Sequence, residues 1–432
     1  MLRLAEAADG HLARIRLPGG LIGAGQIRVL ARLASELGDG RVELTSRGNV
    51  QLRGLAPSAA GPLTDELAVA GLFPSPEHDR VRNMVASPLA GLDGGPDLTA
   101  IVQALDAALC ARPRLAELPG RFLFAVDDGR GHVAGLGADV LAQVRAEGTV
   151  VNGLTVQGGD ADYTVAEDVD DPEIGEGSGS AESFGHHRPP NPPTSPNPPR
   201  KCCAGYTPRL VGPTDPRATV TVMLACAEAF LDVRASEGGT AWRIADLTDG
   251  AERVRAAVAA RLGLTCAPQP PAASPAPDGT DGPDAPDGPA ARPAGVVGPD
   301  GTTAVLLAPL GRLTATQLTW LAERVGERPA RITPWRSVVL PDLPDAAGLI
   351  REAAGLGFGV DAASPWLRVT ACAGRPGCAS ALADVQADAA AFAARWPDLI
   401  VHVSGCARHC GRPAATQVDV TATSEGYQVD GV

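Results

Sequence analysis

Four cysteines near the end of the chain have the residue type and spacing of an iron–sulfur ligand set. Cys372 and Cys378 are separated by five residues, and Cys406 and Cys410, which follow after a gap of 27 residues, are separated by three. Sets of four thiolates bind iron–sulfur clusters or zinc. Structural zinc sites usually take cysteines two to four residues apart, so the wider first pair favours iron. We therefore expect one 4Fe–4S cluster on these four residues.

The residues around the first pair support this expectation. Pro376 and Gly377 form a tight turn that brings Cys372 and Cys378 together. A helix predicted over Ala379–Arg395 begins directly after Cys378, and its N-terminal N–H groups would stabilise an anionic cluster. Buried free cysteines in an alanine- and glycine-rich core are the competing interpretation, which does not explain the paired short spacings. The other five cysteines show no ligand spacing and are interpreted as core or linker residues: Cys110, Cys202, Cys203, Cys226 and Cys266.

The bulk composition excludes some classes of partner. The chain has 432 residues, enough for several domains, and a net charge of -13, which argues against a general nucleic-acid binder. A local cluster of arginines can still bind an anion. No apolar run is long enough to cross a bilayer, and the N-terminus lacks the order of a secretory signal. We expect a cytoplasmic protein without nucleic-acid or membrane partners, whose nine cysteines are thiols or metal ligands.

The chain repeats itself on either side of two biased segments. Residues 172–216 and 267–299 are rich in Pro, Gly and Ser, and we interpret both as flexible insertions or linkers. Outside them, Pro18–Ile22 resembles Pro309–Leu313 at a separation of 291 residues, which drifts to 286 further along. A period this long does not indicate a solenoid. It predicts two related halves that face each other across a shared site.

Each half has the same predicted order of elements. A strand leads to a helix (Gly25–Leu37 or Thr316–Val325), a second strand, a longer helix and a further strand. Neither half contains a GxGxxG fingerprint or a Walker lysine loop. The sequence therefore gives no indication of its own NAD or ATP site.

Several further motifs carry a resemblance to a known superfamily. The cysteine pattern, the duplicated halves and LTSRGNVQLRGL at Leu44–Leu55 resemble the sirohaem sulfite/nitrite reductases. Within that superfamily, RLPGG at Arg16–Gly20, RNxxxSPLAG at Arg82–Gly91 and TPWR at Thr333–Arg336 are most similar to the precorrin-3B synthases of the cobalamin pathway. The resemblance covers residues 11–165 and 300–422 well and residues 218–265 loosely.

The resemblance implies an α+β fold with a duplicated, nitrite/sulfite reductase-like architecture and pseudo-twofold symmetry. Two ferredoxin-like half-domains and two α/β sirohaem-type domains are expected. Their expected ranges are 1–65 for the first half-domain, 66–266 for the first α/β domain with its insertion, 267–299 for a linker, 300–347 for the second half-domain and 348–432 for the second α/β domain, which carries the cysteines.

The resemblance also implies a tetrapyrrole site lined with arginines, whose planar guanidinium groups pair bidentately with the carboxylates of such a ligand. It assigns catalytic roles to Arg16, Arg82 and Arg121. It assigns substrate binding to Arg47, Gln51, Asn83 and Arg336. Two positions depart from the reductase pattern, because Leu123 and Glu43 stand where basic residues are expected. A leucine cannot give a proton to a bound oxyanion, so reduction of sulfite or nitrite is disfavoured.

The function implied is O2-dependent hydroxylation of precorrin-3A with closure of a lactone. Iron in or near the cleft would activate O2, and an external NADH-linked donor would supply electrons through the cluster. His409 is a candidate iron ligand, although histidines near a cluster more often lie behind the ligands or at the surface. The alternative is a sirohaem-dependent nitrite or sulfite reductase. A cluster-bearing electron carrier is a third interpretation, which leaves the arginines unexplained.

Overall fold

The computed structural model describes residues 2–145, 148–152, 154–156, 216–263, 293–413 and 415–431. The predicted insertion at 172–216 lies outside these ranges except for Pro216, which begins a helix. The predicted linker at 267–299 is too long, because Gly295–Val297 form strand β11. Val296 and Val297 pair with β12 and so extend a sheet rather than joining two domains. No helix in the described ranges is long and apolar enough to cross a membrane.

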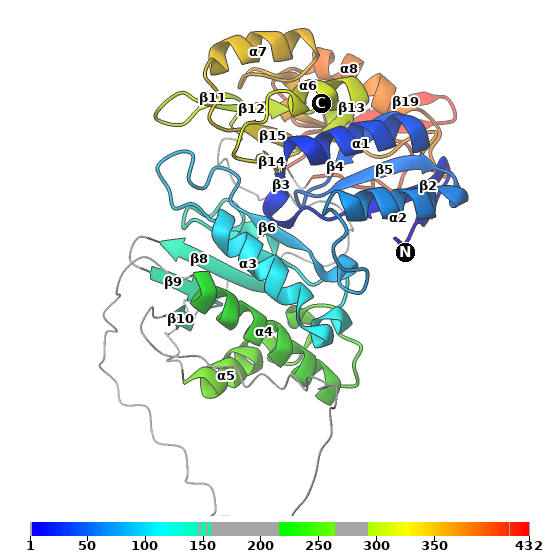
Figure 1. The fold of residues 1–432 in the computed structure, drawn as a ribbon. Coiled ribbons are helices and arrows are strands. Elements are labelled where there is room, and N and C mark those ends of the chain that lie inside the picture. Colours follow the sequence, from blue (N-terminus) through cyan, green and yellow to red (C-terminus); the bar gives the residue numbers. More distant parts are fainter. Residues whose placement is uncertain are drawn as a thin grey trace, which may run out of the picture.

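The first half-domain is a five-stranded antiparallel sheet covered by helices α1 (Ala24–Leu37) and α2 (Ala60–Val69) (Figure 1). The helix α2 crosses residue 65, where a domain boundary was expected. Alternate residues of the strands face the helices, as the period of two predicts. The strands, in their order across the sheet, are β1 (Ala5–Ala7), β2 (Gly10–Ile15), β5 (Val50–Leu55), β4 (Arg41–Leu44) and β13 (Arg312–Thr314).

The second half-domain has the same topology and is covered by helices α6 (Ala315–Ala322) and α7 (Ala346–Gly355). The helix α7 crosses residue 347, the other expected boundary. The strands, in their order across the sheet, are β11 (Gly295–Val297), β12 (Thr303–Leu307), β15 (Ser337–Leu340), β14 (Ala330–Ile332) and β3 (Leu21–Ile22).

The two half-domains exchange their fifth strands. The strand β3 from the first half pairs with β14, and β13 from the second half pairs with β4. The same short turn precedes both exchanged strands, with Gly19 (φ 61°) and Leu310 (φ 54°) in the left-handed region. Gly20 must be glycine, because a Cβ there would lie 2.0 Å from the carbonyl oxygen of Ile332. This exchange confirms the predicted duplication and its pseudo-twofold relation.

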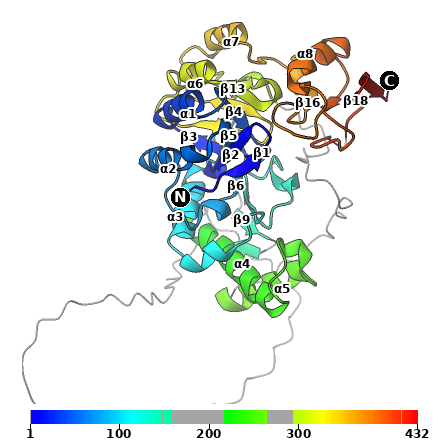
Figure 2. The same ribbon diagram turned by 90° about the vertical axis from the view of Figure 1, so that its right-hand side faces the viewer.

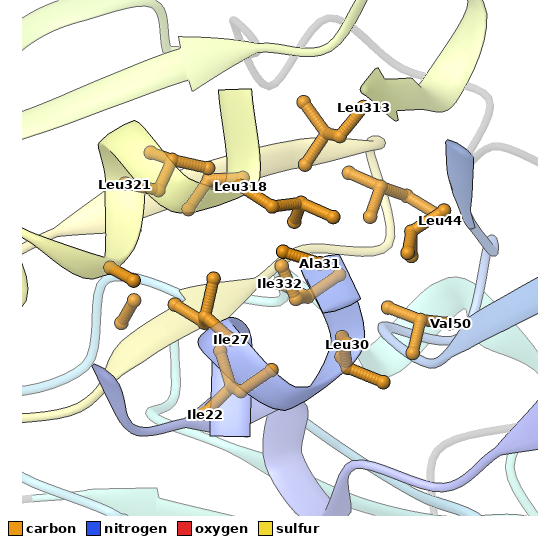
Figure 3. Packing of buried hydrophobic residues seen from close by; sticks show 14 of the residues in the cluster. Ile22, Ile27, Leu30, Ala31, Leu44, Val50, Leu313, Leu318, Leu321 and Ile332 are labelled. Atoms are coloured by element: carbon orange, nitrogen blue, oxygen red, sulfur yellow. The ribbon is translucent and has the colours of Figure 1, made fainter. Parts of the chain in front are cut away.

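One hydrophobic core spans both half-domains. The helices α1 and α6 pack side by side, and Ile27 and Leu30 of α1 lie with Leu318 and Leu321 of α6 in a single buried cluster (Figure 3). The apolar residues of α1 recur at helical spacing, so one face of this helix is buried. Because the cluster draws on both sheets, neither half-domain has a core of its own.

The first α/β domain has a mixed sheet covered by helices α3 (Thr99–Cys110), α4 (Pro216–Ser236) and α5 (Gly250–Leu262). Its core centres on Phe122, which contacts Phe124 and Phe230 with ring centroids 5.2 and 4.9 Å away. Strands β6, β7 and β8 run parallel. The sheet order is β10 (Leu154–Val156), β9 (Gly148–Val151), β8 (Val140–Arg145), β7 (Phe124–Asp127) and β6 (Met84–Ala86).

The second α/β domain is smaller, with α8 (Val385–Arg395) against one face of its sheet (Figure 2). The sheet order is β16 (Val369–Ala371), β17 (Val401–Ser404), β18 (Val418–Thr423) and β19 (Gly426–Asp430). The prediction that a helix begins after Cys378 is wrong, because Asp384 caps α8 six residues later by accepting a hydrogen bond from the Ala387 N–H. The residues before it form a loop, in which Leu382 donates to the Gly405 carbonyl at 2.7 Å.

Candidate functional site

Arginines from separate elements gather where the first half-domain meets the first α/β domain. Arg16 follows β2, Arg47 lies in the turn between β4 and β5, Arg121 precedes β7, and Arg243 lies between α4 and α5. The turn that holds Arg47 is closed by Thr45 and Asn49, whose backbones pair at 2.9 Å. These guanidinium groups lie close enough to perturb one another electrostatically, as the following contacts show.

Arg16 is held by a buried asparagine, Asn83, which a second buried asparagine contacts in turn. Its guanidinium donates to Asn83 Oδ1 at 3.2 Å, and Asn83 donates to the Phe122 carbonyl at 3.2 Å. Asn49 also contacts Asn83 and accepts a hydrogen bond from the Leu17 N–H at 2.8 Å. Asn83, predicted to bind substrate, is fully buried and therefore positions Arg16 instead of lining an open surface.

The charges of Arg16 and Arg47 are poorly compensated by the protein. Burial lowers the pKa of Arg16 to about 10, with Arg47 acting in the same direction and Asp79 opposing it. Burial also lowers the pKa of Arg47, and the neighbouring Arg243 adds to this effect. Among the described residues no carboxylate is within ion-pair distance of either side chain. Both side chains are partly buried, and charges removed from water are costly without a partner, so this arrangement favours an anionic ligand.

The other two arginines border a short turn that sequence reasoning did not single out. Arg121 lies over the ring of Trp242, with its Cζ 5.8 Å from the ring centroid. Arg243 donates through Nε to Asp139 at 2.7 Å. Both Trp242 and Arg243 fall in the segment that resembled the family only loosely. In the sequence, the available signal was a tryptophan next to an arginine.

Arg82 is placed differently from the other predicted catalytic arginines. It forms a two-pronged ion pair with Asp106, with both N–O distances at 2.7 Å. Burial acts to lower the pKa of Arg82, but the Asp106 carboxylate outweighs it and the pKa is raised. Arg16 and Arg82 line a cavity of about 230 Å³ between α1 and α3. The charge of Arg82 is therefore already neutralised within the protein.

Gln51 and Glu43 belong to a polar row on the outer face of the first sheet. Gln51 donates to Glu43, which also accepts two hydrogen bonds from Arg312 at 2.6 and 2.9 Å. Gln51, predicted to bind substrate, thus contacts the residue that departs from the reductase pattern. The carboxylate of Glu43 is paired with Arg312. The position where a basic residue was expected therefore adds no positive charge to the site.

Arg336, predicted to bind substrate, does not occupy the position in the second half that corresponds to Arg47 in the first. In the aligned turns of the two halves, Arg47 corresponds to Trp335, and Arg336 corresponds to Gly48. Arg336 has φ 61°, and its side chain lies against Gly311, where a Cβ would come within 2.6 Å of its Cδ atom. The Trp335 ring meets His132 with centroids 5.8 Å apart.

The four predicted cluster cysteines lie in loops at one edge of the second α/β sheet. Cys372 follows β16 and Cys406 follows β17, and these parallel strands pair with Ala371 opposite Val403. The Gly405 N–H donates to the Cys372 sulfur at 3.1 Å. Burial raises the pKa of Cys372; the Gly405 N–H opposes the shift, whereas Cys410 and Cys378 add to it. These last two effects place both thiols in the neighbourhood of Cys372.

This loop edge fits a cluster by its donor set and by the N–H bond to sulfur, a contact that tunes iron–sulfur centres. The described ranges contain no group of three or more His, Cys, Asp or Glu side chains arranged to hold a metal ion. The thiolates of a 4Fe–4S cluster bind separate irons, so they stand farther apart than ligands of a single ion. A single-iron site that includes His409 gains no support, and His409 lies 3.2 Å from Asp419.

The cysteine loop is fastened to the first half-domain. Arg53 on β5 donates to the Gly377 carbonyl at 2.9 Å, next to Cys378. The same guanidinium forms a two-pronged pair with Asp9 at 2.9 and 3.0 Å, and it is 5% exposed. Because Asp9 neutralises the guanidinium, the bond from Arg53 to the Gly377 carbonyl fastens the cysteine loop to the sheet without adding an unpaired charge beside it.

Leu123, the other departure from the reductase pattern, is buried. Its side chain is 1% exposed and packs with Val85, Ala125 and Val133. Its backbone N–H donates to Asp139 at 2.9 Å. The position two residues after Arg121 therefore carries an apolar side chain inside a small core, with no group that can transfer a proton.

Comparison with known proteins places this geometry in context. Residues 5–70 match the nitrite/sulfite reductase ferredoxin-like half domain. The chain is 26% identical to the ferredoxin–nitrite reductase of Synechococcus elongatus, covering 98% of this chain and 78% of that protein. It is 27% identical to the precorrin-3B synthase of a Sinorhizobium species, covering 98% of this chain and 79% of that protein.

The fold is also that of a solved structure. The NirA protein of Mycobacterium tuberculosis superposes with a TM-score of 0.62 at 18% identity, covering 97% of this chain and 73% of that one. The chain therefore has the nitrite/sulfite reductase fold, an α+β architecture with ferredoxin-like half-domains. Its relatives are oxidoreductases, and two of them with different activities match it at nearly equal identity.

Proposed function

We propose that the protein is a precorrin-3B synthase, which hydroxylates precorrin-3A with O2 and closes a lactone. One observation carries the proposal: Arg16 and Arg47 are desolvated with no carboxylate at ion-pair distance in the described ranges, and the buried Leu123, two residues after Arg121, supplies no proton-donating side chain. Arg16 and Arg47 suit the carboxylates of a tetrapyrrole. Leu123 offers neither charge nor a proton to a small oxyanion. The precorrin-3B synthase relative supports the same choice.

The chain's own residues would bind and orient the substrate. Arg47 and Arg121 would hold peripheral carboxylates, and Arg16, fixed by Asn83, would approach the ring from the first half-domain. Cys372, Cys378, Cys406 and Cys410 would hold the cluster, which when bound supplies electron transfer. O2 and an external, NADH-linked electron donor complete the proposed reaction.

A nitrite reductase is the second candidate, because the Synechococcus enzyme matches the chain at 26% identity over the same length. A shorter match, 32% identical over 27% of this chain, links it to the nitrite reductase of Leptolyngbya laminosa. Under this candidate, sirohaem would occupy the cleft that the arginines line. The nature of the ligand in that cleft separates the two functions.

The deciding experiment combines a spectrum with two assays on protein purified without air. We expect the broad brown absorbance of an iron–sulfur cluster, without a Soret band. We expect conversion of precorrin-3A only when O2 and a reductant are present, and negligible loss of nitrite with reduced methyl viologen. A Soret band together with nitrite turnover at ~1 per second or faster, an ordinary enzyme rate, would overturn the proposal in favour of the reductase.

A further inference from the structure

Asp419 lies on the face of the second α/β sheet that points away from α8. Its neighbours on β18, Val418 and Val420, pack in the core beneath that helix, and successive residues of a strand face opposite sides of a sheet. Asp419 is 9% exposed, and in the parallel pairing it stands beside the fully buried His402 of β17. A carboxylate removed from water in this way needs hydrogen-bond or ion-pair partners.

The partners of Asp419 come from the loop that carries the second pair of cysteines. Arg412 Nε donates to Asp419 Oδ2 at 2.5 Å. The Nδ1 atom of His409 lies 3.2 and 3.3 Å from the two carboxylate oxygens. His409 and Arg412 stand on either side of Cys410 in the sequence. One carboxylate therefore fastens the loop to β18 just before and just after a predicted cluster ligand.

The backbone of this loop takes a conformation that needs outside support. His409 has φ 48°, in the left-handed region where residues other than glycine are uncommon. Its N–H donates to the Cys406 carbonyl at 3.3 Å, and the Arg412 N–H donates to the His409 carbonyl at 3.1 Å. Such conformations persist when the surrounding contacts fix them. The bonds to Asp419 supply contacts of this kind, and the conformation of His409 sets the direction in which Cys410 follows.

The first α/β sheet has an apolar side chain at the corresponding place. Asp419 is the second residue of β18 and pairs with the second residue of β17. Leu141 is the second residue of β8 and pairs with the second residue of β7. It packs against a small apolar cluster that contains Leu123. A carboxylate at this position is thus a feature of the domain that carries the cysteines, as expected if it serves them.

We propose that Asp419 is a positioning residue for the iron–sulfur cluster: through His409 and Arg412 it fixes the loop of the second cysteine pair, and it neutralises Arg412 beside that pair. The inference rests on the four-cysteine cluster of the proposed function, which the alternative reductase shares. Replacing the carboxylate should release the loop and leave the Arg412 charge without its partner. Because the net charge around a cluster helps to set its reduction potential, an uncompensated cation favours the more negative, reduced state.

Four variants of the full-length protein, purified without air, separate these two effects. Asp419→Asn and Arg412→Gln both break the tie, but they change the local charge in opposite directions. Two controls make the same charge changes and leave the tie intact. Asp430→Asn alters the exposed residue of β19 that pairs opposite Asp419, and Arg408→Gln alters an exposed residue of the cysteine loop. The readouts are the rate at which an iron chelator bleaches the visible absorbance and the reduction potential, followed by EPR.

We expect Asp419→Asn to lose its cluster to the chelator about tenfold faster than the wild type, with a less negative reduction potential. Arg412→Gln should also lose its cluster faster, but with a more negative potential, because the cation itself is gone. Since Arg412 is 42% exposed, this variant keeps the test valid even if Asp419→Asn folds poorly. Both controls should lose the cluster at the wild-type rate.

The results that would overturn the inference differ from those that would overturn the proposed function. If Asp419→Asn and Arg412→Gln keep the cluster as long as the wild type does, the positioning role is wrong and the proposed function stands. If both lose it faster but their potentials shift in the same direction, a general loosening of the domain is the cause, and the positioning role again fails. A wild-type protein that binds no cluster would remove the inference and the cluster of the proposed function together.

Discussion

The two central sheets share one topology, but the side chains on their outer faces differ in polarity. In the first sheet, a row of paired positions crosses the strands with polar side chains. In the second sheet, the corresponding row is mostly apolar. The first row consists of Arg14, Gln51, Glu43 and Arg312. The second row consists of Val305, Val339, Arg331 and Leu21. Duplication kept the backbone pairing and left the two faces free to diverge.

Each outer face holds a loop of the opposite half's α/β domain. The first sheet binds the cysteine loop, because Arg53 donates to the Gly377 carbonyl. The second sheet binds the loop after β6, because Arg331 donates to the Pro88 and Ala90 carbonyls at 2.9 and 2.6 Å. The same kind of contact therefore serves a polar site in one half and an apolar packing surface in the other.

The loops that follow β7 and β17 also differ between the two α/β domains. Asp127, the last residue of β7, is fully buried and accepts hydrogen bonds from the backbones of Gly129, Gly131 and Val133 in the loop that follows. After β17, the corresponding loop carries Cys406 and Cys410 and has no such carboxylate. One loop is closed by its own side chain. The other keeps its thiols for a ligand, which is the arrangement expected if only the second α/β domain binds the cluster.

The largest expected effect comes from removing a thiol from the second α/β domain. Cys378→Ser should abolish the brown absorbance and lower the iron content from about four atoms per chain to well below that, since the cluster needs four thiolates. Iron analysis and visible absorbance measure this. Cys110→Ser, in the first α/β domain, is the control and should keep its iron. Full iron in Cys378→Ser would show that the cysteines do not act as one set.

Replacing the arginine that holds each loop should lower the unfolding free energy by different amounts in the two sheets. Arg53→Gln leaves the Asp9 carboxylate, 13% exposed, without its partner and should cost ~3 kcal/mol or more of unfolding free energy. Arg331→Gln loses hydrogen bonds to carbonyl groups and should cost ~1–2 kcal/mol. Denaturant unfolding of the metal-free protein measures both. Equal losses would mean that the two contacts are energetically alike.

Exchanging side chains between the rows tests the faces themselves. Val339 is fully buried, so Val339→Gln places an amide where it finds no partner and should cost ~1–3 kcal/mol. Gln51→Val, at the corresponding place in the first row, should cost less than ~1 kcal/mol because Gln51 is only partly buried. Thermal and denaturant unfolding give the comparison. A larger loss for Gln51→Val would contradict the division into polar and apolar rows.

We expect Arg47 to favour ligand binding without stabilising the fold. Its partly buried charge has no carboxylate within ion-pair distance in the described ranges, so Arg47→Gln should leave the unfolding free energy unchanged or raise it by up to ~1 kcal/mol. The same change should weaken uroporphyrin binding about tenfold. Denaturation and titration of one preparation measure both quantities. A clear loss of stability without a loss of affinity would assign Arg47 a structural role.

The smallest effect concerns pH. Burial raises the pKa of Asp79, against the lowering effects of Arg16 and Arg82. A carboxyl that holds its proton more tightly when folded stabilises the fold below its unfolded pKa of about 3.9, and that stability is lost as pH rises through the folded pKa. Asp79→Asn should therefore show a smaller fall in stability between pH 4 and pH 6, by ~1 kcal/mol or less. Identical pH profiles would contradict this.

The sequence predicted the scaffold better than the contacts that complete the site. The repeat could be recognised in the sequence because both copies keep a Pro-x-Gly turn followed by a helix at the same spacing. That spacing is shared even where the other residues of the two copies differ. The strand exchange was not predicted, since a two-residue strand such as β3 shows no periodicity. The cap at Asp384 was also missed, because the alanine-rich stretch before it satisfies helix propensity while the loop contacts decide otherwise.

Among the candidate site residues, the sequence indicated the arginines of the motifs but not the residues that contact them. Arg82 was predicted to be catalytic, but Asp106 lies 24 residues later on α3 and only the fold brings the two together. Asn49 lies inside the motif at Leu44–Leu55, yet its bond to Leu17 depends on the packing of β2 against the turn. Arg243 and Trp242 lie in an irregular turn, which no period marks. Long-range pairing is the information that a single sequence does not display.

The exchanged strands also set an order for synthesis and folding. Glu43 and Arg312, which meet across β4 and β13, are 269 residues apart in sequence. During translation the outer edge of β4 therefore stays open until most of the chain has left the ribosome. An open strand edge invites pairing with other chains, and contacts between distant segments form slowly. A nascent chain cut off before residue 312 would expose this edge permanently, so such fragments should depend on chaperones in a way that the full-length protein does not.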